Sequence, residues 1–434
     1  MIPLFAAGQH DVEQFLLRIL LQLIVIVVAA RAGGWLFRRI GQPQVCGEIA
    51  AGILLGPSCF GLLAPDTWSA IFPQDSDLGI VMKVLAEIGL ILLMFLMGQD
   101  FEFGQLRKIG PQALAVSIAG VVLPFVMGFA LAWQMHPAVA AQQHQLGFAL
   151  FVAVALSITA IPVLGRIMME FDLTRTRIGV LTITAAAVDD ATGWIMLAAV
   201  SAVVLGNLVP STIVVMLAAT LAFCAVVLLV VRPLAKRLIQ RSLARNNGDI
   251  TLGGLAWLLV AVFTAAVATN LIGIFSIFGP FVLGAALWDE HDFREAVHRR
   301  LRDFVTVFFL PIFFTYTGLR TRVMALDSGE LWLYCGLILA AAIAGKVIGC
   351  GLATRIGGQM TWTESACVGV MMNTRGLVEL IVINLGREMG VLPESVFCML
   401  VIMALVTTFM TAPLLTRLLA RDETIRLRVG SHAA

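Results

Sequence analysis

The sequence predicts an all-α polytopic membrane protein of about thirteen transmembrane helices, built as two inverted repeats with one discontinuous helix in each. Three observations lead to this prediction. Hydrophobic residues make up 60% of the 434 residues and charged residues only 13%, which is far from the composition of a soluble domain. Apolar runs of bilayer length recur along the chain, and two pairs of similar segments recur seven runs apart. The composition excludes a soluble protein, and nothing in it supports nucleic-acid binding.

The apolar runs are taken as crossings because a helix needs about 20 residues to span a hydrocarbon core about 30 Å thick. Within the run 251–288, Asn270 and Gly273 predict a tight turn, so this run makes two crossings. The thirteen predicted crossings are residues 14–38, 43–58, 79–98, 110–133, 147–168, 176–205, 210–231, 251–268, 270–288, 302–320, 331–355, 362–386 and 392–418.

Basic residues in the loops predict the orientation. If the loops after odd-numbered crossings share one side, that side holds 21 Lys and Arg residues, and the other side holds only Arg320, Arg322 and Arg387. Cytoplasmic loops carry the excess of basic residues. We therefore expect the N-terminus outside and the C-terminus in the cytoplasm. The expected location is the plasma membrane, which is the inner membrane of a bacterium.

Two pairs of crossings have similar sequences. The segment 47–56 (GEIAAGILLG) matches 274–284 (IFSIFGPFVLG), and the segment 92–98 (LLMFLMG) matches 310–319 (LPIFFTYTGL). The partners of each pair are seven crossings apart, and an odd offset means that they enter the membrane in opposite directions. Inverted repeats are typical of secondary transporters. The alternative is that both pairs are merely glycine-rich apolar helices.

The repeat divides a single integral membrane domain, residues 1–434, into predicted parts. These are a first six-helix repeat at 14–205, a linker helix with a cytoplasmic loop at 206–250, a second, inverted six-helix repeat at 251–418, and a short cytoplasmic tail at 419–434.

Two adjacent carboxylates, Asp189 and Asp190, lie near the middle of the sixth crossing. An aspartate at the centre of a membrane helix costs about 2.5 to 3.5 kcal/mol on insertion scales, so the pair indicates function. Neighbouring side chains on a helix point about 100° apart, so the two acids are expected to have different roles. Lys346, the only lysine of the eleventh crossing, lies among small residues and is the expected counter-ion. Pairing leaves one acid free for a cation or a proton.

The fifth and twelfth crossings occupy matching places in the two halves, and polar residues with Pro or Gly interrupt both, at SITAIPV (157–163) and NTRG (373–376). Such residues free backbone groups that must be satisfied inside the protein. Two matched interruptions indicate a binding site between the halves. Because hard cations prefer oxygen ligands, the expected ligands from these segments are Ser157, Thr159, Asn373 and Thr374.

Two further charges, Arg375 and Glu379, are spaced i, i+4 on one predicted helix, which favours a structural ion pair between them. The alternative is that Glu379 is a secondary proton or ion ligand. The histidines fall in predicted loops or termini, and the seven cysteines form no CxxC motif or Cys/His cluster. We therefore expect no transition-metal centre and no cofactor. The sequence also shows no nucleophile paired with a base, so we do not expect an enzyme.

The segments 41–58, 157–194, 373–386 and 410–415 are similar to those of the second monovalent cation:proton antiporter family. The resemblance covers essentially the whole chain. It implies an NhaA-like fold, a homodimer, and a core of the fourth to sixth and eleventh to thirteenth crossings that moves against a dimer domain. It also implies that Asp190 binds the monovalent cation and the proton, while Asp189 pairs with Lys346.

Members with two acids at this place are associated with electrogenic exchange of two protons for one Na+. The predicted function is therefore electrogenic Na+(Li+)/H+ antiport by alternating access in a lipid bilayer. One alternative is K+/H+ antiport of the Kef type without its long C-terminal regulatory domain, because only about sixteen residues follow the last crossing. Another, from a different class, is a cation channel or a membrane sensor on the same fold.

Overall fold

The computed structural model describes residues 9–72, 77–100, 110–171, 173, 176–205, 210–246, 249–357 and 360–420. The described residues form helices joined by turns and short loops, without a strand, which confirms the all-α prediction. In the first half, the helices are α1 (Gln9–Arg39), α2 (Gln44–Leu55), α3 (Phe60–Leu63), α4 (Pro65–Ile71), α5 (Asp77–Asp100), α7 (Pro111–Val139), α8 (Gln145–Ser157), α9 (Ile161–Glu170) and α10 (Arg177–Leu205).

The second half begins with α11 (Pro210–Val226), which a π-helical turn at Val227–Val231 joins to α12 (Arg232–Arg245). A similar turn at Val305–Phe309 joins α15 to α16, and a short 3-10 turn follows at Val323–Ala325. The remaining helices are α13 (Leu252–Ile272), α14 (Phe278–Ala286), α15 (His291–Phe304), α16 (Leu310–Leu319), α17 (Gly329–Gly357), α18 (Trp362–Met372), α19 (Leu377–Glu388) and α20 (Glu394–Ala420).

Ten helices of the described part are long and apolar enough to cross a membrane. Ten of the thirteen predicted crossings each correspond to one of these helices. The other three, 147–168, 270–288 and 362–386, fall on interrupted or shorter helices. The exact number of crossings stays a prediction.

The predicted turn within residues 251–288 is confirmed, but it begins later than the crossing boundaries imply. Helix α13 continues to Ile272, and Gly273 ends it with a φ of +95° and an N–H that donates to Asn270 O. A positive φ is readily adopted only by glycine, which explains this residue at the turn. Helix α14 starts only at Phe278 and has 9 residues.

Two stretches that we expected as loops are helical. Residues 232–245, placed in the cytoplasmic loop of the linker, form α12, and the basic stretch 291–302 belongs to α15. Pro233 does not interrupt the helix because it stands in the first turn of α12, where proline is tolerated. Asp289, which precedes α15, pairs with Arg232 and Lys236 of α12 at 2.9 and 2.5 Å, so the two helices support each other. Residues 421–434 of the predicted cytoplasmic tail lie outside the described part of the chain.

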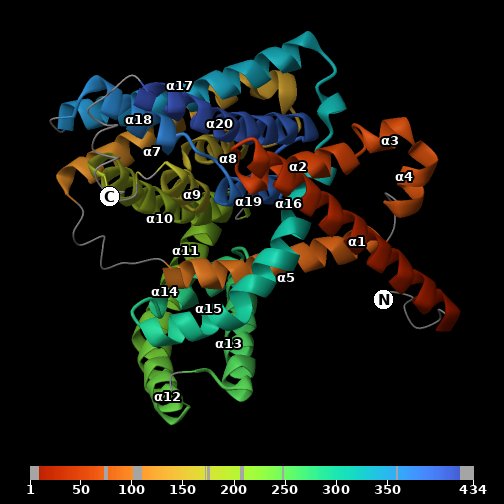
Figure 1. Ribbon diagram of the computed structural model, residues 1–434, viewed down its shortest axis with the longest axis vertical. Coiled ribbons are helices and arrows are strands. Elements are labelled where there is room, and N and C mark those ends of the chain that lie inside the picture. Colours follow the sequence, from red (N-terminus) through yellow and green to blue (C-terminus); the bar gives the residue numbers. More distant parts are fainter. Residues whose placement is uncertain are drawn as a thin grey trace.

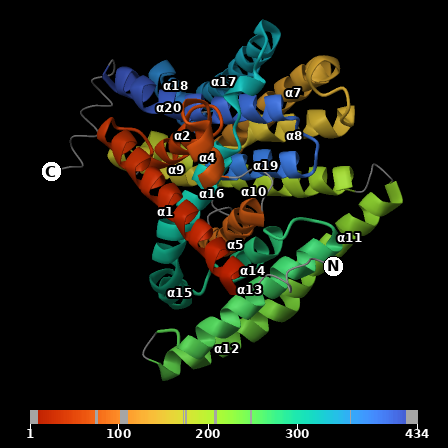
Figure 2. The same cartoon turned by 90° about the vertical axis from the view of Figure 1, so that its right-hand side faces the viewer.

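The helices form two bundles, which Figures 1 and 2 show from two sides. The core bundle contains α7 to α10 and α17 to α20, with α7 and α17 packed along each other. The scaffold bundle contains α1 to α5 and α13 to α16, and α11 and α12 lead from the core to it. This division follows the one that the resemblance implies.

Within the scaffold, matching helices of the two predicted repeats pack through matching glycines. Helix α2 crosses α16 at Gly52, where an added Cβ would lie 2.9 Å from Gly318 Cα. Helix α14 crosses α5 at Gly284, where an added Cβ would lie 3.0 Å from the backbone nitrogen of Gln99. These glycines belong to the sequence pairs that predict the repeat. The two contacts support the inverted repeat, which we keep as an inference.

The ion pairs that join scaffold to core in the described part of the chain lie at one end of the molecule. Glu388, the last residue of α19, contacts Lys83 of α5 at 3.3 Å and Arg320 of the scaffold at 3.6 Å. Arg322 contacts Glu394, the first residue of α20, at 3.2 Å. Arg320 and Arg322 are two of the three basic residues on the predicted outer side.

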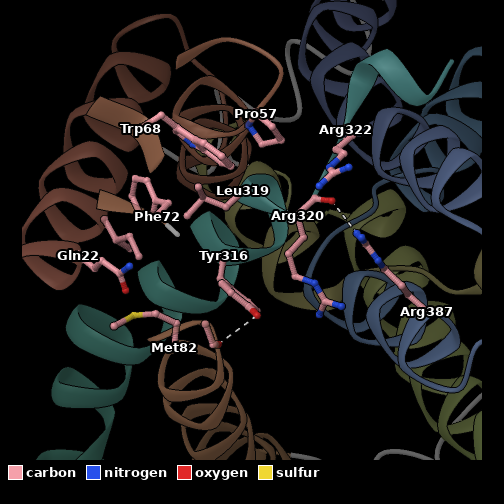
Figure 3. Close-up of a pocket in the computed structure, with 12 residues that line it drawn as sticks. Gln22, Pro57, Trp68, Phe72, Met82, Tyr316, Leu319, Arg320, Arg322 and Arg387 are labelled. Carbon is pink, nitrogen blue, oxygen red and sulfur yellow. Dashed lines mark hydrogen bonds between the residues drawn. The ribbon is translucent and has the colours of Figure 1, made fainter. Parts of the chain in front are cut away.

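The third of these basic residues, Arg387, lies beside them (Figure 3). Its Nη1 donates to Arg320 O at 2.6 Å, and its Nη2 is 3.7 Å from a carboxylate oxygen of Glu394. All three arginines line a cavity of about 230 Å³, together with Tyr316 and Trp68; apart from Arg387, its lining belongs to the scaffold side. Neighbouring acids thus compensate the basic residues at the predicted outer end.

Replacing Gly52 or Gly284 by valine should lower the free energy of unfolding by about 1 to 3 kcal/mol, because the new side chain overpacks a backbone contact. Gly336→Val in α17 is the matched control, since an added Cβ there meets nothing within 4 Å. Thermal unfolding of the purified protein in detergent measures the effect. An equal loss in all three variants would contradict the proposed role of the two glycine contacts.

Candidate functional site

The two interrupted helix pairs cross inside the core bundle. Residues 158–160 separate α8 from α9, and residues 373–376 separate α18 from α19. The backbone N–H of Ala160 donates to Thr374 O at 3.0 Å, and Thr159 Oγ1 lies 3.1 Å from Met372 O. We call residues 158–160 and 373–376 the extended segments. Their contacts satisfy some of the backbone groups that the missing helical turns would have paired. Four helix ends meet at this crossing.

Asp189 of α10 lies beside this crossing, with 1% of its surface exposed. Its carboxylate accepts three bonds: from Ser117 Oγ at 2.6 Å, from Thr159 Oγ1 at 3.0 Å and from Lys346 Nζ at 2.7 Å. The Lys346 side chain is fully buried. Hydrogen bonds and the ammonium together compensate the buried carboxylate, as a buried charge requires.

Ser117 is a site residue that sequence analysis missed. It lies in α7, inside an apolar predicted crossing, and has 1% of its surface exposed. A buried hydroxyl in a transmembrane helix needs a hydrogen-bond partner. The only sequence signal was therefore its position in the apolar run. Nothing in the sequence pointed to Asp189 as its partner, because the contact spans 72 residues.

Asp190 follows Asp189 in α10, so its Cα lies beside the same crossing. Its side chain is outside the described part of the structure. The helix alone shows that the two acids leave the backbone in directions about 100° apart. Asp189 is the acid that pairs with Lys346.

The remaining predicted ligands differ in their surroundings. Asn373 is buried, and its Oδ1 has no hydrogen-bond partner among the described residues. The Ser157 hydroxyl donates to Ala153 O at 2.7 Å, and the Thr374 hydroxyl donates to Met371 O at 2.7 Å, so both satisfy the ends of their own helices. Thr159 Oγ1 also has partners, Asp189 and Met372 O, so Asn373 Oδ1 is the side-chain oxygen of these four that has none among the described residues.

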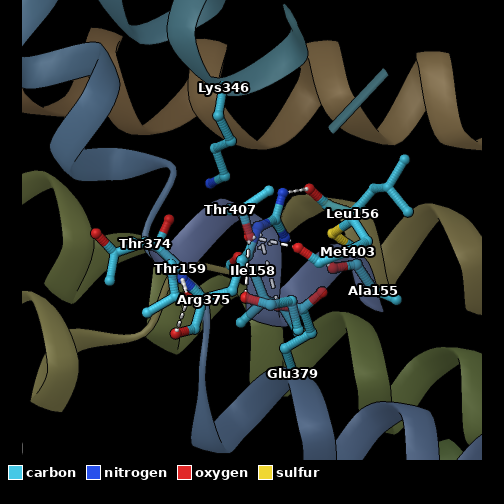
Figure 4. A network of polar contacts seen from close by, with 12 residues as sticks. Ala155, Leu156, Ile158, Thr159, Lys346, Thr374, Arg375, Glu379, Met403 and Thr407 are labelled. Carbon is cyan, nitrogen blue, oxygen red and sulfur yellow. Dashed lines mark hydrogen bonds and ion pairs between the residues drawn. The ribbon is translucent and has the colours of Figure 1, made fainter. Parts of the chain in front are cut away.

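Arg375 is not on the same helix as Glu379, which corrects the sequence prediction. It lies in the extended segment before α19 because the helix is interrupted at residues 373–376. Its guanidinium donates to three carbonyl oxygens at the end of α8 and just beyond it (Figure 4): Ala155 O at 2.8 Å, Leu156 O at 2.5 Å and Ile158 O at 2.8 Å. A cation at the C-terminal end of a helix is stabilising because that end carries partial negative charge.

Glu379 lies close to Arg375, with 3.8 Å between Oε2 and Nε. This separation is an ion pair but exceeds hydrogen-bond length. The carboxylate is buried, and neither of its oxygens has a hydrogen-bond partner in the described part of the chain. The main partners of Arg375 are therefore the α8 carbonyls, and its pairing with Glu379 is secondary. Whether Glu379 also binds a proton or an ion stays a prediction.

A model of the sodium/hydrogen exchanger transmembrane family matches residues 24–421. The chain is 38% identical to the Na+/H+ antiporter NhaS4 of Synechocystis, over 93% of this chain and 97% of that protein. It is 35% identical to cation/H+ antiporter 17 of Arabidopsis thaliana over 94% of this chain, and 30% identical to K+/H+ antiporter 1 of Saccharomyces cerevisiae over 89%. These alignments cover 49% and 44% of the two eukaryotic relatives, so the chain spans about half of their length.

Among solved structures, the sodium proton antiporter MjNhaP1 of Methanocaldococcus jannaschii superimposes with a TM-score of 0.63, over 96% of this chain and 99% of that one. The two sequences are 15% identical, so the likeness concerns the fold. It agrees with the predicted fold class.

Removing Lys346 alone should destabilise the protein strongly. Lys346→Met leaves Asp189 buried with only two hydroxyl donors, and breaking a buried ion pair costs about 3 to 5 kcal/mol. The double variant Asp189→Asn/Lys346→Met removes both charges and should recover part of this loss. Thermal unfolding in detergent tests the prediction. A single variant as stable as the wild type would show that the ion pair does not hold the crossing together.

Proposed function

The chain belongs to the sodium/hydrogen exchanger family, and we propose that it is an electrogenic Na+(Li+)/H+ antiporter. Its family and its similarity to proteins named as cation/H+ antiporters support cation and proton exchange. The observation that carries the finer proposal is the Asp189–Lys346 ion pair beside the crossing, with Asp190 as the next residue. One acid has a counter-ion, and the other is available for transport.

The cation site that we propose has oxygen ligands only. Asp190 supplies the charge, and Thr159 and Asn373 supply neutral oxygens from the two extended segments. The buried Asn373 Oδ1 without a hydrogen-bond partner supports this assignment, because buried polar atoms are seldom left unpaired. Hard cations prefer such ligands. Among the described residues there is no group of three or more His, Cys, Asp or Glu side chains that could hold a metal ion.

Exchange follows from competition at Asp190. A protonated carboxyl is neutral and does not attract Na+, whereas the carboxylate attracts it. Release of the proton must then precede binding of the cation on either side of the membrane. If the site is exposed to one side of the membrane at a time, protons that flow outward down their gradient drive the cation inward. Protons that flow inward drive the cation outward.

The Asp189–Lys346 pair supports the electrogenic stoichiometry. One proton exchanged for one Na+ at Asp190 moves no net charge, so a second proton is needed. A cation bound beside Asp189 competes with the ammonium for this carboxylate. Lys346, displaced from Asp189, is the group that we propose to carry the second proton. Movement of one cation across the membrane in one direction is then coupled to movement of two protons in the other direction.

K+/H+ exchange is the second candidate, and the similarity to the yeast protein named as a K+/H+ antiporter favours it. The same carboxylate could serve either ion. In both cases we propose a homodimer in a plasma membrane with the C-terminus in the cytoplasm. In both, the core bundle moves against the scaffold bundle.

Asp190→Asn should abolish cation-dependent proton movement, because an amide cannot exchange a proton for a cation. The test is dye-reported proton flux in proteoliposomes after addition of Na+, Li+ or K+, measured across a range of pH. Asp66→Asn is the matched control, since Asp66 is exposed in α4. The ion that gives the largest wild-type flux decides between the two candidates. Antiport is refuted if no cation moves protons in the wild type.

An imposed membrane potential should change the rate of Na+/H+ exchange, because two protons for one Na+ move a net charge. Wild type and Lys346→Gln are compared in proteoliposomes with and without a K+/valinomycin potential, at equal pH gradients. The wild-type rate should respond, and any flux remaining in the variant should respond less. A wild-type rate that ignores the potential would show electroneutral exchange while leaving antiport itself intact.

A further inference from the structure

The cavity of about 230 Å³ at the predicted outer end of the molecule is separate from the ion pair at the crossing, because neither Asp189 nor Lys346 lines it. Its lining changes in character from one side to the other (Figure 3). Three arginines lie on one side and Gln22 lies on the other, with aromatic and apolar side chains between them. A ligand that fits this cavity therefore needs a different chemistry at each end.

The arginine side has hydrogen-bond donors that its acidic neighbours leave unused. The Arg320 guanidinium lies 3.6 Å from Glu388, which exceeds hydrogen-bond length. Glu388 also contacts Lys83 at 3.3 Å, so two cations share this carboxylate. Within the described ranges, the Arg320 side chain is a donor in no hydrogen bond, and its Cζ lies 5.6 Å from the centre of the Tyr316 ring. Its N–H groups can therefore bind an anion in the cavity.

Arg387 and Arg322 bring further positive charge to the same side. Arg387 Nη2 is 3.7 Å from Glu394, and Arg322 contacts the same carboxylate at 3.2 Å. One carboxylate thus serves two guanidinium groups. Guanidinium groups bind the paired oxygens of carboxylates and similar anions, and such charge-assisted hydrogen bonds are stronger than neutral ones. This side of the cavity therefore favours a monoanion, and it repels a cation.

The middle of the cavity is apolar. Trp68 of α4 and Phe72, which follows this helix, line one part of it, and Tyr316 and Leu319 of α16 line another. Trp68 Nε1 donates to Leu55 O at 2.9 Å, so the indole has no donor left for a ligand. Aromatic side chains bind a ring through apolar burial and ring–ring contact. An inorganic anion would leave this apolar surface without a partner.

Gln22 of α1 supplies an acceptor on the side opposite the arginines (Figure 3). It has 3% of its surface exposed, and its Nε2 donates to Ile71 O at 2.5 Å. This bond fixes the orientation of the carboxamide, because only its nitrogen can donate. The carboxamide oxygen, Oε1, has no hydrogen-bond partner among the described residues, although buried acceptors are seldom left unpaired. A ligand hydroxyl at this end would supply the missing donor.

We propose that the cavity binds a small aromatic monoanion, namely a carboxylate or sulfonate with a hydroxyl group at the far end of its ring. The anionic group binds Arg320 and Arg387, and the hydroxyl donates to Gln22 Oε1. The ring packs against Trp68 and Tyr316. Drug-sized ligands occupy pockets of about 300 to 1,000 Å³, so a cavity of about 230 Å³ restricts the ligand to one ring with short substituents.

Such a ligand joins the two bundles at the outer end. Arg387 belongs to α19 of the core, whereas Arg320 follows α16 of the scaffold. An anion held by both must be released before the bundles separate there. The ligand should therefore slow exchange. This consequence rests on the proposed function, because it requires the core to move against the scaffold.

Ligand-observed NMR with the purified full-length protein in detergent measures the binding of three probes of similar shape. The probe para-hydroxybenzenesulfonate has the anion and the hydroxyl, para-hydroxybenzenesulfonamide lacks the charge, and benzenesulfonate lacks the hydroxyl. The wild type should bind the first probe most tightly. Removing the charge should weaken binding about tenfold and removing the hydroxyl about fivefold, because a charged hydrogen bond contributes more than a neutral one.

Two variants assign the contacts at the two ends. Arg320→Gln should weaken binding of both sulfonates about tenfold and leave binding of the sulfonamide unchanged, because it removes only a contact to the charge. Gln22→Leu should abolish the preference for para-hydroxybenzenesulfonate over benzenesulfonate. Arg18→Gln, which changes an exposed arginine of α1, is the matched control and should alter neither. Thermal unfolding in the same detergent verifies that each variant is folded.

Equal wild-type affinities for the sulfonate and the sulfonamide would overturn the proposal. It would also be overturned if Arg320→Gln bound the sulfonates as tightly as Arg18→Gln does. A hydroxyl preference that survives in Gln22→Leu would refute the contact with Gln22. Binding is measured without an ion gradient, so these results do not depend on antiport.

Wild-type proteoliposomes test the consequence for transport. The probe para-hydroxybenzenesulfonate, added outside, should slow cation-dependent proton flux. Bound probe with unchanged flux would refute the bridge between the bundles, whereas the absence of any flux without the probe would refute antiport alone.

Discussion

The structure depends on one constraint: charge and unpaired backbone in the membrane interior must be compensated within the protein. Asp189 meets this constraint through Lys346, Ser117 and Thr159, which come from three other segments of the core bundle. Because one carboxylate binds all three, it fixes α7, α10, α17 and the extended segment after α8 relative to one another. The charge that would destabilise a single helix thereby holds four segments together.

The same constraint explains Arg375. Because α8 ends at Ser157, its last carbonyls have no helical partners. Because the chain is not helical just before α19, Arg375 is free to donate to these carbonyls. Each interruption thus supplies what the other needs, and neither would be tolerated alone in a bilayer. The crossing keeps irregular backbone at membrane depth without exposing it to lipid. Thr159 and Asn373, which we propose as ion ligands, can stand there only because this backbone is already satisfied.

The all-helical membrane fold could be predicted from the sequence alone, because apolar runs of bilayer length are a local signal. The orientation and the inverted repeat stay predictions. The sequence also pointed to Lys346 as counter-ion, since a lone buried lysine has few possible partners. It did not reveal that Arg375 leaves its helix to cap α8. The i, i+4 spacing to Glu379 assumed a continuous helix, and only the three-dimensional crossing shows where the interruption falls. Ser117 was missed because a single hydroxyl in an apolar run has no pattern.

The magnitudes of the ion pairs suggest which contacts change during transport. The pairs between the bundles, Lys83–Glu388, Arg320–Glu388 and Arg322–Glu394, involve side chains that are 24% to 45% exposed. Pairs of this kind contribute about 0.2 to 1 kcal/mol each, whereas breaking the buried Asp189–Lys346 pair costs about 3 to 5 kcal/mol. Separation of the bundles at that end is therefore less costly than disruption of the crossing. A core that moves as one unit against the scaffold, carrying its site intact, is the motion that this difference favours.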